Sequence, residues 1–165
     1  MNIKPIPQEP YGLESDLLTT PPEPHVPATV RCREHYLSGE VEFIVDTGAT
    51  LTTIMPSDRK RLGIQPFYLV EGEPHTYGGV SSSGLPLKHL LDAEIAFQDV
   101  DGLPHVVKLP RLMIAVDRSA VAARRESILG RDVLQHCRID LAADPPCLLF
   151  RSANPKPIDQ ESEES

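Results

Sequence analysis

Cysteine is scarce in this sequence, and its placement excludes a disulfide framework. Cys32, Cys137 and Cys147 are odd in number and lie far apart in a chain of 165 residues. Small domains that depend on disulfides have an even set of cysteines at characteristic spacings. We therefore expect free thiols in a reducing compartment, which indicates a cytoplasmic location.

Metal-ligand spacings and long apolar runs are also missing. The six histidines form no His-x-His or His-Glu-x-x-His pattern, and the cysteines form no Cys-x-x-Cys pattern. We therefore predict no metal and no other cofactor. No apolar run is long enough to span a bilayer, so no membrane partner is expected. The first residues, Met1-Asn2-Ile3-Lys4-Pro5, also lack the apolar segment of a signal peptide.

Basic residues are fewer than acidic residues, and the formal net charge is -8. Phosphate binding needs a basic patch, and the densest basic cluster is Arg59-Lys60-Arg61. We interpret that cluster as the solvent-facing side of a short helix. A nucleic-acid partner is therefore not expected. The length fits one domain with a core of its own.

Composition divides the chain into three zones. Residues 1–27 are rich in proline, which removes backbone donors and favours extended backbone, so we predict an arm or linker. Binding of a partner by this arm is the alternative. Residues 28–151 are predicted to form the folded domain. Residues 152–165 are polar and acidic, and we expect them to be disordered.

Within the domain, alternation of apolar and polar residues predicts mostly strands. We expect a hairpin over 28–45 with its turn near 37–40, strands at 91–97, 106–109, 112–116, 138–141 and 147–150, and a surface loop over 118–126. Pro110 is expected to separate the second and third of these strands. Two short helices are predicted at 56–63 and 131–137, the first starting at Pro56 and stopping at Gly63.

The candidate catalytic residue is Asp46. Phe43-Ile44-Val45 is typical of a buried strand, and it runs directly into the turn Asp46-Thr47-Gly48-Ala49. A packed strand that enters a short turn holds a carboxylate rigidly. Other acids have no glycine turn beside them, and solvent-exposed or capping roles are predicted for Asp92, Glu94, Asp132 and Asp140.

Asp46-Thr47-Gly48-Ala49 with its apolar lead-in resembles the active-site signature of the aspartic peptidases, especially the retropepsin-like branch. A second segment, Ser127-Ile128-Leu129-Gly130-Arg131-Asp132-Val133-Leu134, resembles the apolar-apolar-Gly segment and short helix that close each lobe of that fold. The resemblance implies a mostly β fold, a closed retropepsin-like β-barrel or sandwich lobe with one or two short helices. It also implies that Ile128, Leu129 and Gly130 support the catalytic turn.

The resemblance further implies an aspartic endopeptidase that cuts extended peptides. Such hydrolysis needs two carboxylates that share one proton, one acting as base on a water and the other hydrogen-bonding the carbonyl oxygen. The chain has one suitable turn, so the second Asp46 is expected from a second copy in a two-fold homodimer. As in the family, the Thr47 hydroxyl is then expected to bond backbone across the dimer axis. The alternatives are a non-catalytic domain of the same fold, used for dimerisation or peptide binding, and a β-barrel adaptor in which Asp46 caps a turn.

Small residues dominate the stretch from 75 to 84. By resemblance it lies where retropepsins carry the flap that closes over a peptide, with Tyr77, Gly78, Gly79 and Val80 in contact with substrate. An ordinary surface loop is the alternative. Retroviral members also pair an Asp, at the position of Thr50, with an Arg at the position of Arg131. Because Thr50 has no charge, we expect Arg131 to find another acceptor, such as an acid of the partner subunit.

Overall fold

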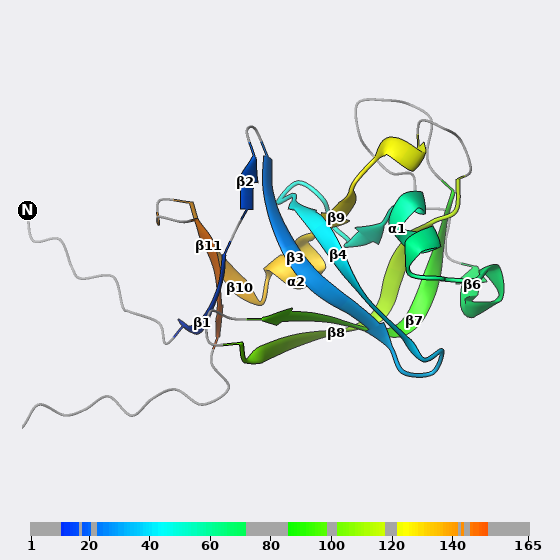
Figure 1. The fold of residues 1–165 in the computed structure, drawn as a ribbon, viewed down its shortest axis with the longest axis horizontal. Coiled ribbons are helices and arrows are strands. Elements are labelled where there is room, and N and C mark those ends of the chain that lie inside the picture. The colour runs from blue at the N-terminus through cyan, green and yellow to red at the C-terminus, as the bar shows by residue number, and fades with distance from the viewer. Residues whose placement is uncertain are drawn as a thin grey trace, which may run out of the picture.

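The chain folds into a mostly β structure with a few short helices (Figure 1). The computed structural model describes residues 11–16, 18–20, 23–71, 86–98, 102–117, 122–141, 143 and 146–151. In chain order, the elements of that part are β1 (Tyr11–Asp16), β2 (Leu18–Thr20), β3 (Glu23–Cys32), β4 (Leu37–Val45), β5 (Thr53–Ile54), α1 (Pro56–Arg61), η1 (Pro66–Tyr68), β6 (Leu69–Glu71), β7 (Leu87–Gln98), β8 (Pro104–Ala115), η2 (Ala122–Arg124), β9 (Ser127–Leu129), α2 (Arg131–Leu134), β10 (Cys137–Asp140) and β11 (Cys147–Arg151).

The main sheet closes on itself. Its strand order is β2-β3-β4-β9-β5-β8-β7-β6, and an additional pairing of β3 with β7 joins the two halves. The strands β3, β4, β9, β5, β8 and β7 therefore form a complete ring, while β2 and β6 extend it. Closure leaves the strands of the ring without free edges, which is how barrels avoid pairing with other chains. The predicted closed β-barrel with short helices is confirmed.

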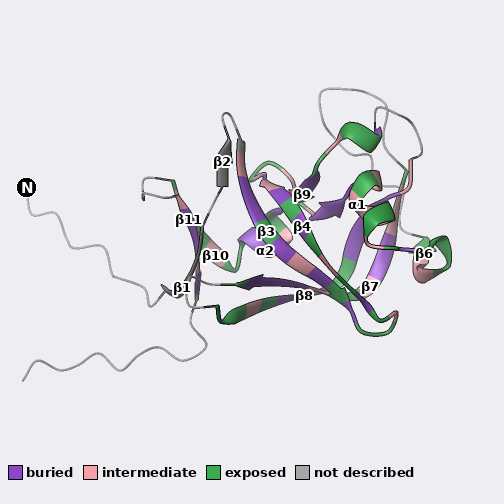
Figure 2. Cartoon of the chain, viewed as in Figure 1, coloured by how far each residue is buried: buried purple, intermediate pink, exposed green. Residues whose placement is uncertain are grey.

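The core fills this ring and also includes residues of β11, and it is built by the alternation seen in the sequence (Figure 2). In β4, Val41, Phe43 and Val45 are buried, while Glu40 and Glu42 are exposed. The largest fully buried side chains include Phe43, Phe97, Phe150, Leu112 and Leu129, which come from five different strands. Each such side chain contributes about 1.5–3 kcal/mol by leaving water. The strand that leads to Asp46 is therefore fixed by the core.

A second sheet lies beside the barrel, with the order β1-β11-β10. β11 pairs antiparallel with β1 on one side and with β10 on the other. The two carboxyl-terminal strands were predicted, but β1 was not, because its partner lies at the opposite end of the chain.

The predicted proline-rich arm is therefore partly wrong. β1, β2 and the first residues of β3 all fall within residues 1–27, and all are paired with other strands. Proline favours extended backbone and is tolerated where no ladder N–H is needed. Pro27 lies between the part of β3 that pairs with β2 and the part that pairs with β7, so no strand faces it on that side. The predicted tail, 152–165, lies outside the described residues.

The predicted hairpin is present, but its turn was misplaced. β3 and β4 pair antiparallel, and the turn lies at residues 33–36, where Tyr36 has a positive φ of 53°. Gly39, taken as a turn residue, lies inside β4. A Cβ there would come 2.5 Å from Cδ2 of Leu62, so this glycine makes room for the residue that ends α1. The glycine reflects close packing between distant segments.

The expected break at Pro110 was also wrong, because β8 continues through it. β7 and β8 pair at Leu91 with Arg111 and again at Ala93 with Leu109, and the ladder skips the residues between. Asp92, opposite Pro110, has a positive φ of 50°. The sheet thus accommodates the proline with a local irregularity and regains its register one residue later.

The two α-helices are as short as expected, and both follow segments of the candidate site. α1 begins at Pro56 and is followed by Gly63, whose φ is 72°, as predicted for the stop. α2 covers only four residues, and Cys137, expected on that helix, lies in β10. The segment expected as a surface loop contains η2, whose Ala122 is buried.

Candidate active site

Asp46 follows β4 directly and is held by its own backbone and side chain. Its N–H donates to the Leu129 carbonyl over 3.1 Å, and its carbonyl accepts from the N–H of Ala49 over 3.2 Å. Its carboxylate oxygen Oδ1 accepts the N–H of Gly48 over 2.8 Å. A strand end and a tight turn therefore fix the carboxylate together.

The turn presents this carboxylate to solvent. Asp46 is half-buried, while Thr47 and Gly48 are exposed. A Cβ at Gly48 would lie 3.1 Å from Oδ1, so the absence of a side chain lets the turn close around the carboxylate. Among the described residues, Oδ2 of Asp46 accepts no hydrogen bond. One oxygen is thus oriented by the backbone, and the other is available to a water or a second carboxylate.

A single short strand, β9, passes under the turn. It pairs parallel with β4, so that Val45 faces Leu129, and antiparallel with β5 through Thr53 and Ile128. β9 thereby separates the strand before the turn from the strand after it. Ile128 and Leu129, predicted to support the turn, lie in this strand, with Leu129 fully buried.

Gly130 follows β9 at the point of closest approach to the turn. A Cβ there would lie 2.5 Å from the carbonyl carbon of Leu51 and 2.8 Å from the nitrogen of Thr52. Real Cβ atoms do not approach backbone so closely, so only glycine fits at this position. The N–H of Gly130 donates to Oγ1 of Thr52 over 3.0 Å. In the described part of the chain, the turn and the segment beneath it lie together, and the sequence singled out every residue of both. These residues are Asp46, Thr47, Gly48, Ala49, Ile128, Leu129 and Gly130.

This combination of a strand-borne Asp-Thr-Gly turn with an apolar-apolar-Gly segment beneath it can be compared with known proteins. The aspartyl protease family model matches residues 28–133. The chain belongs to the aspartyl protease family. A crystal structure of a retropepsin-like aspartic protease from Rickettsia conorii is similar, with a TM-score of 0.50 and 16% identity over 83% of this chain and 90% of that chain. At this identity the likeness shows a common fold. No curated protein matches the chain.

In this family member, Asp132 supports the turn in a way that sequence reasoning missed. Its Oδ1 accepts the N–H of Thr52 over 2.8 Å, the hydroxyl of Thr52 over 2.7 Å and the N–H of Val133 over 3.0 Å. The hydroxyl of Thr52 also accepts the N–H of Gly130. The Asp132 carboxylate is therefore linked, through Thr52, to the segment after the turn and to Gly130 beneath it. The sequence signal for this role was Thr52, whose hydroxyl lies in an apolar stretch. A buried hydroxyl needs a hydrogen-bond partner, and Thr52 is fully buried.

Arg131 finds its acceptor within the same chain. Its Nη2 donates to Oγ1 of Thr50 over 3.0 Å, so positions 50 and 131 are joined by a hydrogen bond from a charged guanidinium to an uncharged hydroxyl. Two backbone hydrogen bonds join the same segments. The N–H of Arg131 donates to the Ala49 carbonyl over 2.9 Å, and the N–H of Asp132 donates to the Thr50 carbonyl over 3.2 Å. The expectation that Arg131 needs an acceptor other than Thr50 was therefore wrong, since a hydroxyl accepts without carrying charge.

A further polar link ties β9 to α1. The Ser127 hydroxyl donates to Oδ2 of Asp58 over 2.6 Å and accepts the N–H of Met55 over 3.0 Å. Arg61 pairs with the other oxygen of Asp58 over 2.6 Å. Ser127 is fully buried, so this link satisfies a polar group inside the fold.

The predicted flap residues, Tyr77, Gly78, Gly79 and Val80, lie outside the described residues. Within the described ranges, no three His, Cys, Asp or Glu side chains gather in a way that could hold a metal ion. No helix in the part of the chain under description has the length and apolar character needed to cross a membrane.

Proposed function

We propose that this chain is an aspartic endopeptidase that hydrolyses peptide bonds through a water activated by two Asp46 carboxylates, one from each subunit of a homodimer. The observation that carries the proposal is the intact turn. Asp46 directly follows a core strand, one carboxylate oxygen is oriented by Gly48, and the other accepts no hydrogen bond from the described residues. Family membership supports the reaction class.

The chemistry follows from bringing two such carboxylates together. Like charges at short distance cannot both be ionised, so the pair retains one proton. The ionised carboxylate takes a proton from water as the water oxygen bonds to the peptide carbonyl carbon. The protonated carboxyl gives its proton to the carbonyl oxygen, which leaves a tetrahedral diol. The diol then collapses: the C–N bond breaks, the departing nitrogen takes up a proton from the carboxyl that received it from water, and one diol hydroxyl returns its proton to the other carboxylate as the C=O bond re-forms.

A homodimer is proposed because one chain supplies one turn. The sequence has a single Asp-Thr-Gly, and a two-fold axis passing beside it would place two identical turns face to face. Thr47 is exposed beside Asp46, which supports its proposed role as a donor to the partner's backbone across that axis. Extended peptides are the proposed substrates, with residues 77–80 acting as a flap.

We also propose a cytoplasmic location. All three cysteines are free, and Cys32 and Cys147 are buried in the fold. Free thiols are maintained in reducing compartments, whereas an oxidising compartment favours disulfides.

The test of the reaction is cleavage of a peptide library by the wild type, Asp46→Asn and Asp92→Asn. The first variant replaces a carboxylate by an amide of nearly equal volume, and cleavage should fall by at least ~10²-fold. Asp92 is exposed and has a positive φ that Asn tolerates, so its variant is a matched control that should keep wild-type turnover. Wild-type turnover in Asp46→Asn would refute the assignment. Peptide binding without cleavage by the wild type would favour a non-catalytic binding domain.

The test of the dimer is dilution. Sedimentation at micromolar concentration should give the mass of two chains, and activity per chain should fall as the protein is diluted below its dissociation constant. Full activity in a strictly monomeric sample would rule out the shared pair of carboxylates.

A further inference from the structure

His25 is a buried titratable residue of β3 that the proposed chemistry does not use. Its side chain is only 11% exposed, and neither ring nitrogen has a hydrogen-bond partner among the described residues. Nε2 lies 3.4 Å from Oε1 of Glu126, whose side chain is 59% exposed. This separation allows an ion pair but no aligned hydrogen bond, so the attraction depends on the charge of the imidazole ring.

The strand register places this pair near the turn at Asp46. His25 pairs with Ile44 of β4, and Ile44 pairs with Ile128 of β9. Paired residues share a face of a sheet, and so do residues two positions apart along a strand. Glu126 comes two positions before Ile128, and Asp46 comes two positions after Ile44. The contact of His25 with Glu126 therefore joins β3 to the residue that precedes β9, across the strand that leads to Asp46.

The charge of this contact is the one that pH changes. In the described part of the chain, the residue that forms an ion pair with His25 is Glu126. Carboxylates and guanidinium groups ordinarily keep their charge between about pH 5.5 and pH 7.5, whereas imidazole changes its charge there. The other ionisable residues on the elements around His25 are Glu23 on β3, Glu40 and Glu42 on β4, Asp46 after β4, and Arg124 and Arg125 before Glu126, while β2 has none.

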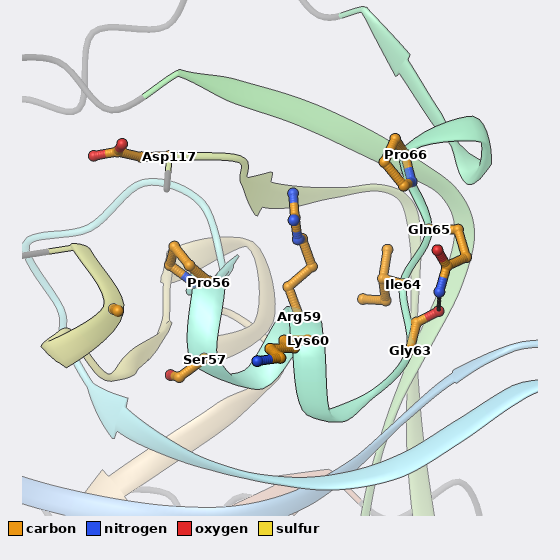
Figure 3. A pocket seen from close by; sticks show the side chains of 10 residues that line it. Pro56, Ser57, Arg59, Lys60, Gly63, Ile64, Gln65, Pro66 and Asp117 are labelled. Carbon is orange, nitrogen blue, oxygen red and sulfur yellow. Dashed lines mark hydrogen bonds between the residues drawn. The ribbon is translucent and has the colours of Figure 1, made fainter. Parts of the chain in front are cut away.

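The segment that precedes β9 is incompletely packed on the side of α1. Ser127, the first residue of β9, is bonded to Asp58 of α1. α1 and η2 are in contact, but a cavity of about 460 Å³ remains beside them, lined in part by Pro56 and Ser57 of α1 and by Ala123 of η2 (Figure 3). This cavity leaves η2 room to shift, so the contact at Glu126 adds to the restraint on the segment that enters β9.

We propose that His25 is a positioning residue for the candidate active site: in its charged form it holds Glu126 against β3 and so fixes the start of β9 beneath the turn at Asp46. β9 carries the support of this turn, because the Leu129 carbonyl accepts the N–H of Asp46 and Gly130 follows directly. The inference rests on the proposed function, and it adds a control by pH that lies outside the two Asp46 carboxylates.

The direction of this control follows from the charge of the ring. At acidic pH the imidazolium is paired with Glu126, and a buried cation without that partner would be costly. As the pH rises, the ring loses its proton and the attraction is lost, so the start of β9 is held less firmly. Glu126 is more than half exposed, so solvent screens the pair, and we expect an effect of about threefold in an equilibrium constant.

The first test is a double-mutant cycle of His25→Gln and Glu126→Gln, read by urea unfolding at one protein concentration. All proteins carry Asp46→Asn, so that neither cleavage nor titration of Asp46 contributes. The two substitutions should be coupled by about threefold in the unfolding equilibrium constant at about pH 5.5, and not measurably at about pH 7.5. Equal coupling at both pH values, or none at the acidic one, would overturn the proposal.

A matched control and a single variant complete this test. Glu34→Gln removes an exposed carboxylate from the turn between β3 and β4, and it should show no coupling to His25→Gln. If His25→Gln does not fold, Glu126→Gln decides alone: it should destabilise the protein more at the acidic pH than at the higher one, whereas Glu34→Gln should not. The same pH dependence in both variants would refute the pairing.

The second readout reports the support of the turn and needs no activity. The N–H of Gly130 donates to Oγ1 of Thr52 over 3.0 Å, so its ¹H–¹⁵N chemical shift reports how β9 lies against the segment after the turn. In the Asp46→Asn parent this shift should change between the two pH values, and it should change less when Glu126→Gln is added. An equal change in both proteins would show that the pair does not position β9.

Catalysis is measured with Asp46 intact. At about pH 5.5, Glu126→Gln should lower kcat about threefold and leave KM nearly unchanged, while at about pH 7.5 its kcat should match the wild type. Glu34→Gln should match the wild type at both. Equal kcat in the wild type and Glu126→Gln at the acidic pH would contradict the role in catalysis. If the wild type cleaves no peptide, the proposed function fails, and the cycle and the Gly130 shift still decide whether His25 positions β9.

Discussion

Replacing Asp132 by alanine should weaken the support of the catalytic turn. Oδ1 of Asp132 accepts the backbone N–H and the hydroxyl of Thr52, over 2.8 Å and 2.7 Å, and the N–H of Val133 over 3.0 Å. Thr52 is fully buried, so water cannot replace the lost acceptor without opening the fold. The N–H of Val133 keeps the Gly130 carbonyl as a second acceptor, at 3.1 Å.

The magnitude follows from the two donors of Thr52. Each buried donor left without an acceptor costs about 1–3 kcal/mol. The hydroxyl can rotate toward another acceptor, whereas the backbone N–H cannot, so we expect the free energy of unfolding to fall by about 3 kcal/mol. A shift of the turn by about 1 Å would cost up to about 10²-fold in rate. Because the turn carries the proposed catalytic carboxylate, kcat should fall more than KM rises.

The assay combines urea unfolding with kcat and KM for four proteins. Asp132→Asn keeps an oxygen acceptor without its charge, and it should recover all but about 1 kcal/mol of the stability. Glu42→Ala removes an exposed carboxylate from β4 and should change stability by less than about 0.5 kcal/mol. If Asp132→Ala unfolds at the wild-type urea concentration and keeps the wild-type kcat, the carboxylate does not support the turn.

Further predictions concern Gly130 and two titrating side chains. Gly130→Ala should lower the free energy of unfolding by about 2–3 kcal/mol or more in thermal denaturation, because its Cβ would lie 2.5 Å from backbone of Leu51; a wild-type melting temperature would contradict the close approach. Burial, and then the charge of His136, lower the pKa of His105, so its NMR titration midpoint should lie below 6.5 and should rise in His136→Gln. As the pH falls, His105 is protonated in the unfolded state before it is protonated in the folded state, so it reduces the free energy of unfolding below about pH 6.5. A titration midpoint at or above 6.5 would contradict the lowered pKa. Burial raises the pKa of the Cys137 thiol to about 11, so iodoacetamide at pH 8 should modify it more slowly than in urea-unfolded protein; equal rates would show an exposed thiol.

The structure of the turn at Asp46 could be predicted from sequence because its determinants are local. Three apolar residues, an acid and a glycine define the end of β4, and Ile128-Leu129-Gly130 defines β9 in the same way. Strand alternation likewise located β7, in which Ala93, Ile95 and Phe97 are buried, and the two terminal strands were also predicted. The conformation of these segments can be predicted from their own residues.

The rest depended on contacts that local patterns do not contain. Gly39 is set by Leu62 and not by a turn, and the conformation of Asp92 lets the sheet pass Pro110. β1 needs a partner from the far end of the chain. Asp132 was read as a capping or exposed acid, because its bonds to Thr52 exist only after β9 has placed it there.

The position of β9 between β4 and β5 has a consequence for the timing of synthesis. The turn at Asp46 is made early, but the segment that holds it is made more than a third of the chain later. A growing chain that has not yet released residues 127–132 from the ribosome has its candidate catalytic carboxylate but no strand to close the ring beside it. Pairings over such separations form late, because loop closure must precede them. A nascent chain therefore remains without the strand that supports the turn at Asp46 until nearly the whole domain has emerged.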